Sequence, residues 1–96
     1  MGVDKILKRK REEILRVAAT HGAHNVRIFG SAARGDAGPT SDVDFLVEFE
    51  AGRSLFDLVG LGQDLEKLLG RRVDVVEPDG IHWYIKENVL QEAVAL

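Results

Sequence analysis

The chain has 96 residues, 45% hydrophobic and 30% charged, and we expect one domain over residues 1–96 with no room for a second module. Its formal net charge of −3 argues against a protein whose main role is sequence-independent nucleic-acid binding, because such binding depends on neutralising phosphates. The lack of cysteine excludes disulfides and thiolate zinc sites, and with no stretch resembling a signal peptide or a membrane span we expect a cytoplasmic protein.

The N-terminal segment, residues 4–20, predicts a helix that ends near Gly22. The apolar residues able to share one stripe are Leu7, Ile14, Leu15 and Ala18. The segment is also basic, with Lys5, Lys8, Arg9, Lys10, Arg11 and Arg16 against Asp4, Glu12 and Glu13. A solvated helix face would explain this charge, and a docking surface for an acidic partner or RNA is the alternative.

A strand, a sharp turn and a brief helix follow. Residues 26–29 (VRIF) predict a short strand, which Gly30 breaks. Residues 31–34 can start a brief helix whose N-terminal amides point at the space above the strand. We then expect a loop over residues 35–41. Its turn-forming residues are Gly38 and Pro39.

Residues 42–49 (DVDFLVEF) predict a strand with two faces of different character. Side chains at i and i+2 share a face, so Asp42 and Asp44 project together. The residues of the other face are Val43, Phe45, Val47 and Phe49. Two neighbouring carboxylates repel each other, which raises one pKa unless a cation lies between them. Magnesium is usually held by one or two carboxylates plus substrate phosphates, so the strand predicts a metal–nucleotide site.

A long helix is predicted over residues 55–69, after a turn at 51–53. Ser54 is a natural N-cap with Asp57 three residues later, a variant of the capping box, and Gly70 ends the helix. The leucines expected in the core are Leu55, Leu58, Leu61, Leu65, Leu68 and Leu69.

The last third of the chain predicts a third strand and a final helix. Residues 72–76 (RVDVV) form the strand, which is rich in β-branched residues. Pro78 and Gly80 turn the chain into a helix over about residues 81–89, and the tail can add an edge strand. The alternating elements predict an α/β (α+β) fold with a small mixed β-sheet flanked by helices.

Asp74 interrupts the valines of the third strand. Its side chain faces away from Val73 and Val75, which we expect to pack under the helices. If the second and third strands are neighbours, Asp74 emerges on the face that carries Asp42 and Asp44. Like charges opposite one another on a sheet repel, so three converging carboxylates indicate a bound metal.

The run GSAARGDAGPTSDVDFLV resembles the signature of the DNA polymerase beta-like nucleotidyltransferase superfamily, and the short chain with RVDVV resembles its minimal nucleotidyltransferase family. The resemblance extends from about Val26 to Val89 and implies the polymerase beta-like fold. The run is not the phosphate loop GxxxxGK[ST], because no lysine follows its glycines. Ser31 is not a hydrolase nucleophile, because the GxSxG elbow is absent.

The resemblance also implies roles for the three aspartates. Asp42 and Asp44 match the carboxylates that bind two magnesium ions. Asp74 matches the third carboxylate, which helps to bind metal and activates the acceptor hydroxyl. Two such metals stabilise the attacking and leaving oxygens of an in-line displacement at the α-phosphate, and pyrophosphate leaves.

Three residues of the glycine-serine turn match the nucleotide-binding part of the signature. Gly30 and Ser31 match the phosphate contacts, in agreement with the freedom of a glycine backbone to approach a phosphate and the ability of a serine hydroxyl to donate to it. Arg34 is a phosphate ligand in one interpretation and a clamp between the loop and an acidic neighbour in the other.

Members of the minimal family are often paired with a small helical HEPN-domain toxin, for which they are the antitoxin. The resemblance therefore implies AMP transfer from ATP to a toxin tyrosine, in a hetero-oligomer with the toxin and without membrane or strong nucleic-acid binding. One alternative is an antitoxin that blocks the toxin sterically without catalysis. Another is a nucleotidyltransferase that modifies a small molecule or an RNA end, guided by the basic N-terminal helix.

A few aromatic and histidine residues stay outside these motifs. Trp83 and Tyr84 could contact the partner, although we expect core packing for at least one of them. His21 and His24 suit a capping or surface role better than metal binding. His82 is close to Trp83 and could approach a nucleotide.

Overall fold

The computed structural model describes residues 3–38 and 41–96. The helices are α1 (Val3–Arg9), α2 (Arg11–Thr20), α3 (Ser31–Arg34), α4 (Leu55–Leu69), the 3-10 turn η1 (Pro78–Gly80) and α5 (Trp83–Glu92). The strands are β1 (Ala23–Phe29), β2 (Val43–Phe49), β3 (Val73–Val76) and β4 (Val94–Ala95). Within the described residues, no helix combines the length and the apolar character needed to cross a membrane.

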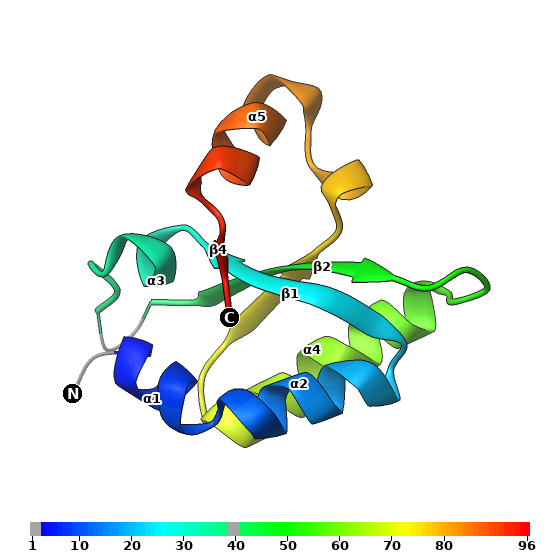
Figure 1. Cartoon of the computed structure of the whole chain (residues 1–96), viewed down its shortest axis with the longest axis horizontal. Helices are drawn as coiled ribbons and strands as arrows, with labels where there is room; N and C mark the ends of the chain where they lie inside the picture. The colour runs from blue at the N-terminus through cyan, green and yellow to red at the C-terminus, as the bar shows by residue number, and fades with distance from the viewer. Residues whose placement is uncertain (1–2, 39–40) are drawn as a thin grey trace.

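The strands form one mixed sheet in the order β3-β2-β1-β4. β1 runs antiparallel to β2 and β4, whereas β2 and β3 are parallel. Figure 1 shows α2 and α4 against one face of the sheet and α5 over the opposite face. The predicted α/β fold with a small mixed sheet flanked by helices is therefore confirmed, including the edge strand at the tail.

The hydrophobic core lies between the sheet and the layer of α2 and α4. Three residues of β2, Val43, Phe45 and Val47, have no exposed surface, and Phe49 is partly buried, as the alternation of the strand predicts. The buried residues that the helices contribute are Leu7, Ile14, Ala18, Ala32, Leu61, Leu65 and Leu69. The apolar face of the sheet is thus closed.

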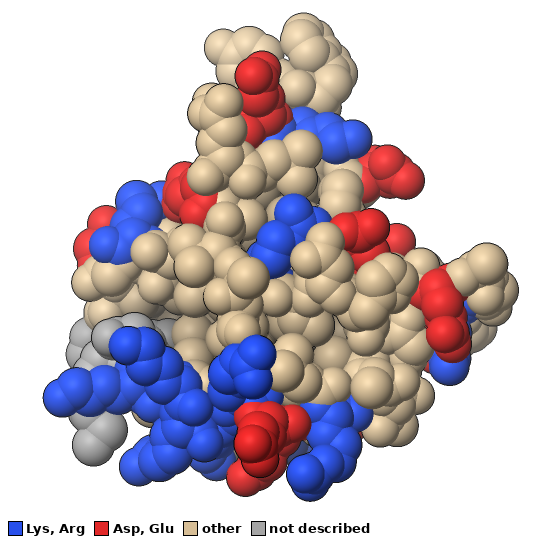
Figure 2. Space-filling view, in the orientation of Figure 1, with Lys and Arg blue, Asp and Glu red and all other residues tan. Residues whose placement is uncertain are grey.

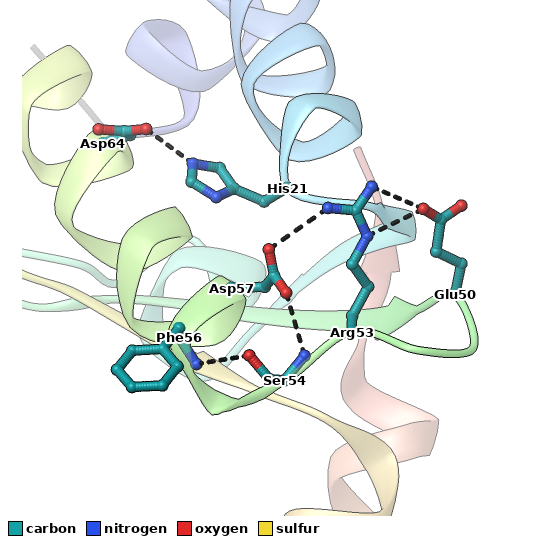
Figure 3. Close-up of polar contacts among 7 residues, drawn as sticks. All are labelled: His21, Glu50, Arg53, Ser54, Phe56, Asp57 and Asp64. Carbon is teal, nitrogen blue, oxygen red and sulfur yellow. Dashed lines mark hydrogen bonds and ion pairs between the residues drawn. The ribbon is translucent and has the colours of Figure 1, made fainter.

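Polar contacts at the start of α4 join it to β2 and α2 (Figure 3). The predicted capping box is present, since the Ser54 hydroxyl accepts from the Phe56 N–H and the Asp57 carboxylate accepts from the Ser54 N–H. Arg53 pairs with Glu50 and, at 3.4 Å, with Asp57. These contacts fix the helix that covers the core.

His21 adds a link between α2 and α4. Its Nε2 lies 2.7 Å from an Asp64 carboxylate oxygen, and its ring packs so closely on Gly60 that a Cβ there would lie 2.9 Å from it. His24 is exposed on β1. Both residues have the structural or surface roles expected, and His21 holds two helices together.

Several predictions about the helices differ from the structure. The first helix is broken at Lys10 into α1 and α2. Leu55, expected in the core, is 71% exposed, because it lies in the first turn of α4 at the margin of the stripe formed by the buried leucines. The predicted turn residue Pro39 lies outside the described residues.

The expectation that Trp83 or Tyr84 packs in the core is wrong. Their exposed fractions are 79% and 75%. The physical reason is that α5 lies over the other face of the sheet, and no residue of α5 is buried. His82 caps this helix, with its Nδ1 accepting from the Tyr84 N–H, and its ring stacks on Trp83.

Candidate active site

Asp44 and Asp74 lie directly opposite each other on the parallel strands β2 and β3. Their neighbours in sequence, Val43 and Val73, are likewise paired and pack toward the core. Since side chains alternate along a strand, both carboxylates project from the opposite face of the sheet. The expectation that the two strands are neighbours and share a carboxylate face is confirmed.

The charges of Asp42 and Asp74 both act on Asp44. Asp42 is exposed immediately before β2, Asp44 on β2 is half-buried, and Asp74, opposite Asp44 on β3, is exposed. Burial raises the pKa of the Asp44 carboxyl, and the charges of Asp74 and Asp42 raise it further. The Arg34 guanidinium acts in the opposite direction on the same pKa. A cation placed among these carboxylates would relieve their repulsion.

Gly30 packs directly on the Asp44 carboxylate. It has φ +69° and ψ −148°, a backbone conformation that L side chains rarely adopt. A Cβ added here would lie 2.5 Å from Asp44 Oδ2. Two features therefore require glycine at this position. One is the turn from β1 into α3, and the other is the close approach of the backbone to the Asp44 carboxylate.

Ser31 and Arg34 are the first and last residues of α3. Ser31 is half-buried, and its carbonyl accepts from the N–H groups of Gly35 and Asp36. Arg34 pairs with Asp36 at 3.2 Å and with Glu92 at 2.8 Å, and Asp36 raises the pKa of its guanidinium. Of the two interpretations of Arg34, the clamp to acidic neighbours is the contact observed in this structure.

The donor set suits a hard divalent cation, because it consists of carboxylate oxygens on one face of a sheet. Within the residues that the structure describes, no three His, Cys, Asp or Glu side chains are closed around a common point as in a formed metal site. Asp42 and Asp74 are exposed, so their carboxylates are free to turn toward Asp44. The metal role of the three aspartates stays a prediction.

Two residues near this site were not predicted from the sequence. Glu92, on α5, bonds Arg34 and raises the pKa of Asp44. Arg71 donates from Nη2 to the carbonyls of Gly38 and Ser41, which holds the loop that leads to Asp42. The hydrogen bonds of both residues join positions more than 20 residues apart in the sequence, and no local pattern reveals such contacts.

The basic N-terminal segment has a surface of its own. Figure 2 shows its Lys and Arg side chains gathered over α1 and the start of α2. Lys10 donates to the carbonyl of Leu68 and Arg11 to that of Leu96, while Lys8, Arg9 and Arg16 are exposed. Lys10 and Arg11 thus have structural roles, and the role of the basic cluster in docking a partner stays a prediction.

Comparison with known proteins gives consistent matches over nearly the whole chain. The model of the nucleotidyltransferase domain family matches residues 5–96. A Methanocaldococcus jannaschii protein provisionally named a protein adenylyltransferase is 46% identical over 84 residues, covering 88% of this chain and 90% of the relative. The protein adenylyltransferase MntA of Thermococcus cleftensis is 38% identical over 92 residues, covering 96% of this chain and 90% of the relative.

Solved structures agree with these matches. A structure provisionally assigned as a minimal nucleotidyltransferase is 48% identical, with a TM-score of 0.88, and covers 100% of this chain and 97% of its own. A toxin–antitoxin structure solved with AMP-PNP has a TM-score of 0.75 at 20% identity, covering 88% of this chain and 69% of its own. At that identity the second likeness concerns the fold alone.

Proposed function

The chain belongs to the nucleotidyltransferase domain family, and we propose that it is a magnesium-dependent antitoxin that transfers AMP from ATP to a tyrosine of a HEPN toxin. The observation that carries this proposal is the pair Asp44 and Asp74, opposite each other on one sheet face with Gly30 packed against the Asp44 carboxylate. The relatives named as protein adenylyltransferases support a protein as the acceptor.

The aspartates would hold the metal and receive the proton of the acceptor. Asp42, Asp44 and Asp74 would provide the ligands for magnesium, which when bound neutralises phosphate charge and stabilises the leaving pyrophosphate. Asp74 would accept the proton of an incoming hydroxyl, and its exposure on the edge strand β3 supports this role. An acceptor can reach it without displacing a covering element among the described residues.

The turn at Gly30 would bind the triphosphate. Gly30 lets the backbone approach a phosphate, and the Ser31 hydroxyl can donate to it. Arg34 could contact the nucleotide as well, because its guanidinium has five N–H donors and its two bonds, from Nε to Asp36 and from Nη1 to Glu92, leave others for a phosphate oxygen.

A toxin as the acceptor fits the size of the domain. We propose that residues 1–96 form one minimal nucleotidyltransferase domain and that a separate toxin presents the acceptor hydroxyl to it. Solved structures that share the fold at 20% identity are of toxin–antitoxin pairs, one of them MntA–HpeT. These structures support a toxin as the partner.

Incubation of the chain with α-labelled ATP, magnesium and the protein encoded by the adjacent gene tests the proposal. We expect label on a tyrosine of that protein. Asp42→Asn should abolish labelling and leave complex formation intact, because Asp42 is exposed and contributes nothing to the core. Protection of cells from the toxin without any label would favour steric blockade, and label on a small molecule or RNA end would favour the other alternative. Transfer by the Asp42→Asn protein would overturn the site.

A further inference from the structure

Tyr84 is the only tyrosine of the chain, and its side chain is exposed. It lies in the first turn of α5, and Figure 1 shows that this turn is the part of the helix farthest from the sheet. The backbone N–H of Tyr84 is already satisfied by His82, and no polar partner of its hydroxyl is found among the described residues. The phenol is thus presented to solvent at the tip of an element that contributes nothing to the core.

We propose that Tyr84 is itself an acceptor, adenylylated by the active site of a second copy of the chain. This inference rests on the proposed function, since it assigns a second substrate to the same site. The Tyr84 Oη attacks the α-phosphorus of ATP, the bond from that phosphorus to the bridging oxygen breaks, and pyrophosphate leaves. The phenolic proton passes to a carboxylate of the active site, and the product is an AMP–tyrosine phosphodiester. No oxidant or further reactant is needed.

The geometry of α5 favours a second copy over the chain's own site. The end of this helix is tied to the site, because Glu92 bonds Arg34 and acts on the pKa of Asp44. Tyr84 precedes Glu92 by eight residues of the same helix, which at 1.5 Å per residue is about 12 Å along its axis. Tyr84 therefore lies at the end of α5 remote from its own carboxylates, while the exposed Asp42 and Asp74 of another copy are open to it.

The surroundings of Tyr84 suit the product. The Trp83 ring lies 5.8 Å from the Tyr84 ring, and the His82 ring lies 5.7 Å from Trp83 in a stacked arrangement. An adenine attached to Tyr84 has these aromatic faces within reach for stacking. The added phosphodiester lies in the first turn of a ten-residue helix, where the helix dipole favours a negative charge.

Two matched variants test the proposal. Asp44→Asn removes catalysis and keeps the acceptor, whereas Tyr84→Phe removes only the acceptor hydroxyl and keeps the catalytic face. The two purified proteins are mixed with α-labelled ATP and magnesium, and modified peptides are identified by mass spectrometry. We expect label on the Asp44→Asn chain at Tyr84 and complete loss of label when the acceptor carries both substitutions. We also expect the labelling rate per chain of the natural protein to rise with its concentration.

The outcomes separate this inference from the proposed function. Each reaction is repeated with the toxin encoded beside the chain, and Tyr84→Phe should label that toxin as the natural chain does. Labelled toxin with an unlabelled chain would overturn self-modification alone. Label on a serine or threonine, or a rate per chain independent of concentration, would also overturn the assignment of Tyr84 in a second copy. If neither toxin nor chain is labelled, the proposed function fails with it.

Discussion

The helices α4 and α5 lie on opposite faces of the same sheet and differ in almost every property that stabilises a helix. Both begin with a side-chain cap, Ser54 in α4 and His82 in α5. α4 buries Leu61, Leu65 and Leu69, whereas α5 buries no residue. The face under α4 is closed and supplies most of the core, whereas the other face, here called open, buries Leu46 and carries the charges.

The strand β2 contributes buried apolar side chains to one face of the sheet and Asp44 to the other. Three inward side chains of β2, Val43, Phe45 and Val47, are fully buried, and each stabilises the fold by about 1.5–3 kcal/mol. Asp44 on the same strand has a raised pKa, so its charge opposes folding. The core face thus offsets the repulsion that the carboxylate face introduces, and a small domain can keep a set of like charges side by side.

The strongest test of the closed face is Phe45→Ala. Phe45 has no exposed surface, and its truncation should lower the free energy of unfolding by about 3–5 kcal/mol. The matched control is Leu55→Ala on the exposed start of α4, which should change that free energy by less than about 0.5 kcal/mol. Urea denaturation measures both, and equal losses would contradict the division between the faces.

Gly30→Ala tests the contact between the turn and the carboxylate face. The positive φ should cost about 1–3 kcal/mol of stability. Displacement of the Asp44 carboxylate should lower nucleotide transfer by about 100-fold, the size of effect seen when a reacting group moves by about 1 Å. Gly35→Ala is the control, since Gly35 also has a positive φ but an added Cβ meets nothing within 4 Å. If both variants transfer nucleotide equally well, the contact with Asp44 has no catalytic role.

The caps of α4 and α5 should differ in how much each contributes to global stability. Ser54→Ala should lower global stability by about 1 kcal/mol, because α4 covers the core. His82→Ala should leave the global transition nearly unchanged and increase amide exchange in α5 alone, since a helix without buried residues can open separately. Hydrogen exchange with denaturant melts measures both, and a global loss in His82→Ala would show that α5 belongs to the cooperative core.

The smallest expected effect is the dependence of the free energy of unfolding on pH. The pKa of Asp44 in the folded protein is raised above its ordinary value of 3.8. As pH rises between these two values, the unfolded chain loses the proton first, so without metal the free energy of unfolding should fall and then level off. Asp44→Asn should remove this fall, and magnesium should oppose it in the natural chain. Denaturation over a pH series measures the slope, and an unchanged slope in the variant would assign it to another group.

The sequence predicted best what depends on nearby residues. Alternation along β2 and β3 gave the carboxylate face, and the helix signals at Ser54 and Gly70 matched the bounds of α4. The prediction was wrong where burial depends on what lies opposite, as for Leu55 at the margin of a helix stripe and Tyr84 on the open face. Glu92 and Arg71 could not be found, because their contacts join segments far apart in the chain.

The position of β3 has a consequence for self-association. Within the described part of the chain, β3 pairs only with β2, so its outer side is an unpaired edge of the kind on which strands of other molecules can add. The strand is only four residues long and carries the charge of Asp74. Short length and a charge are the features by which proteins keep such edges from pairing. The residue predicted to take part in catalysis therefore also helps keep this enzyme from aggregating.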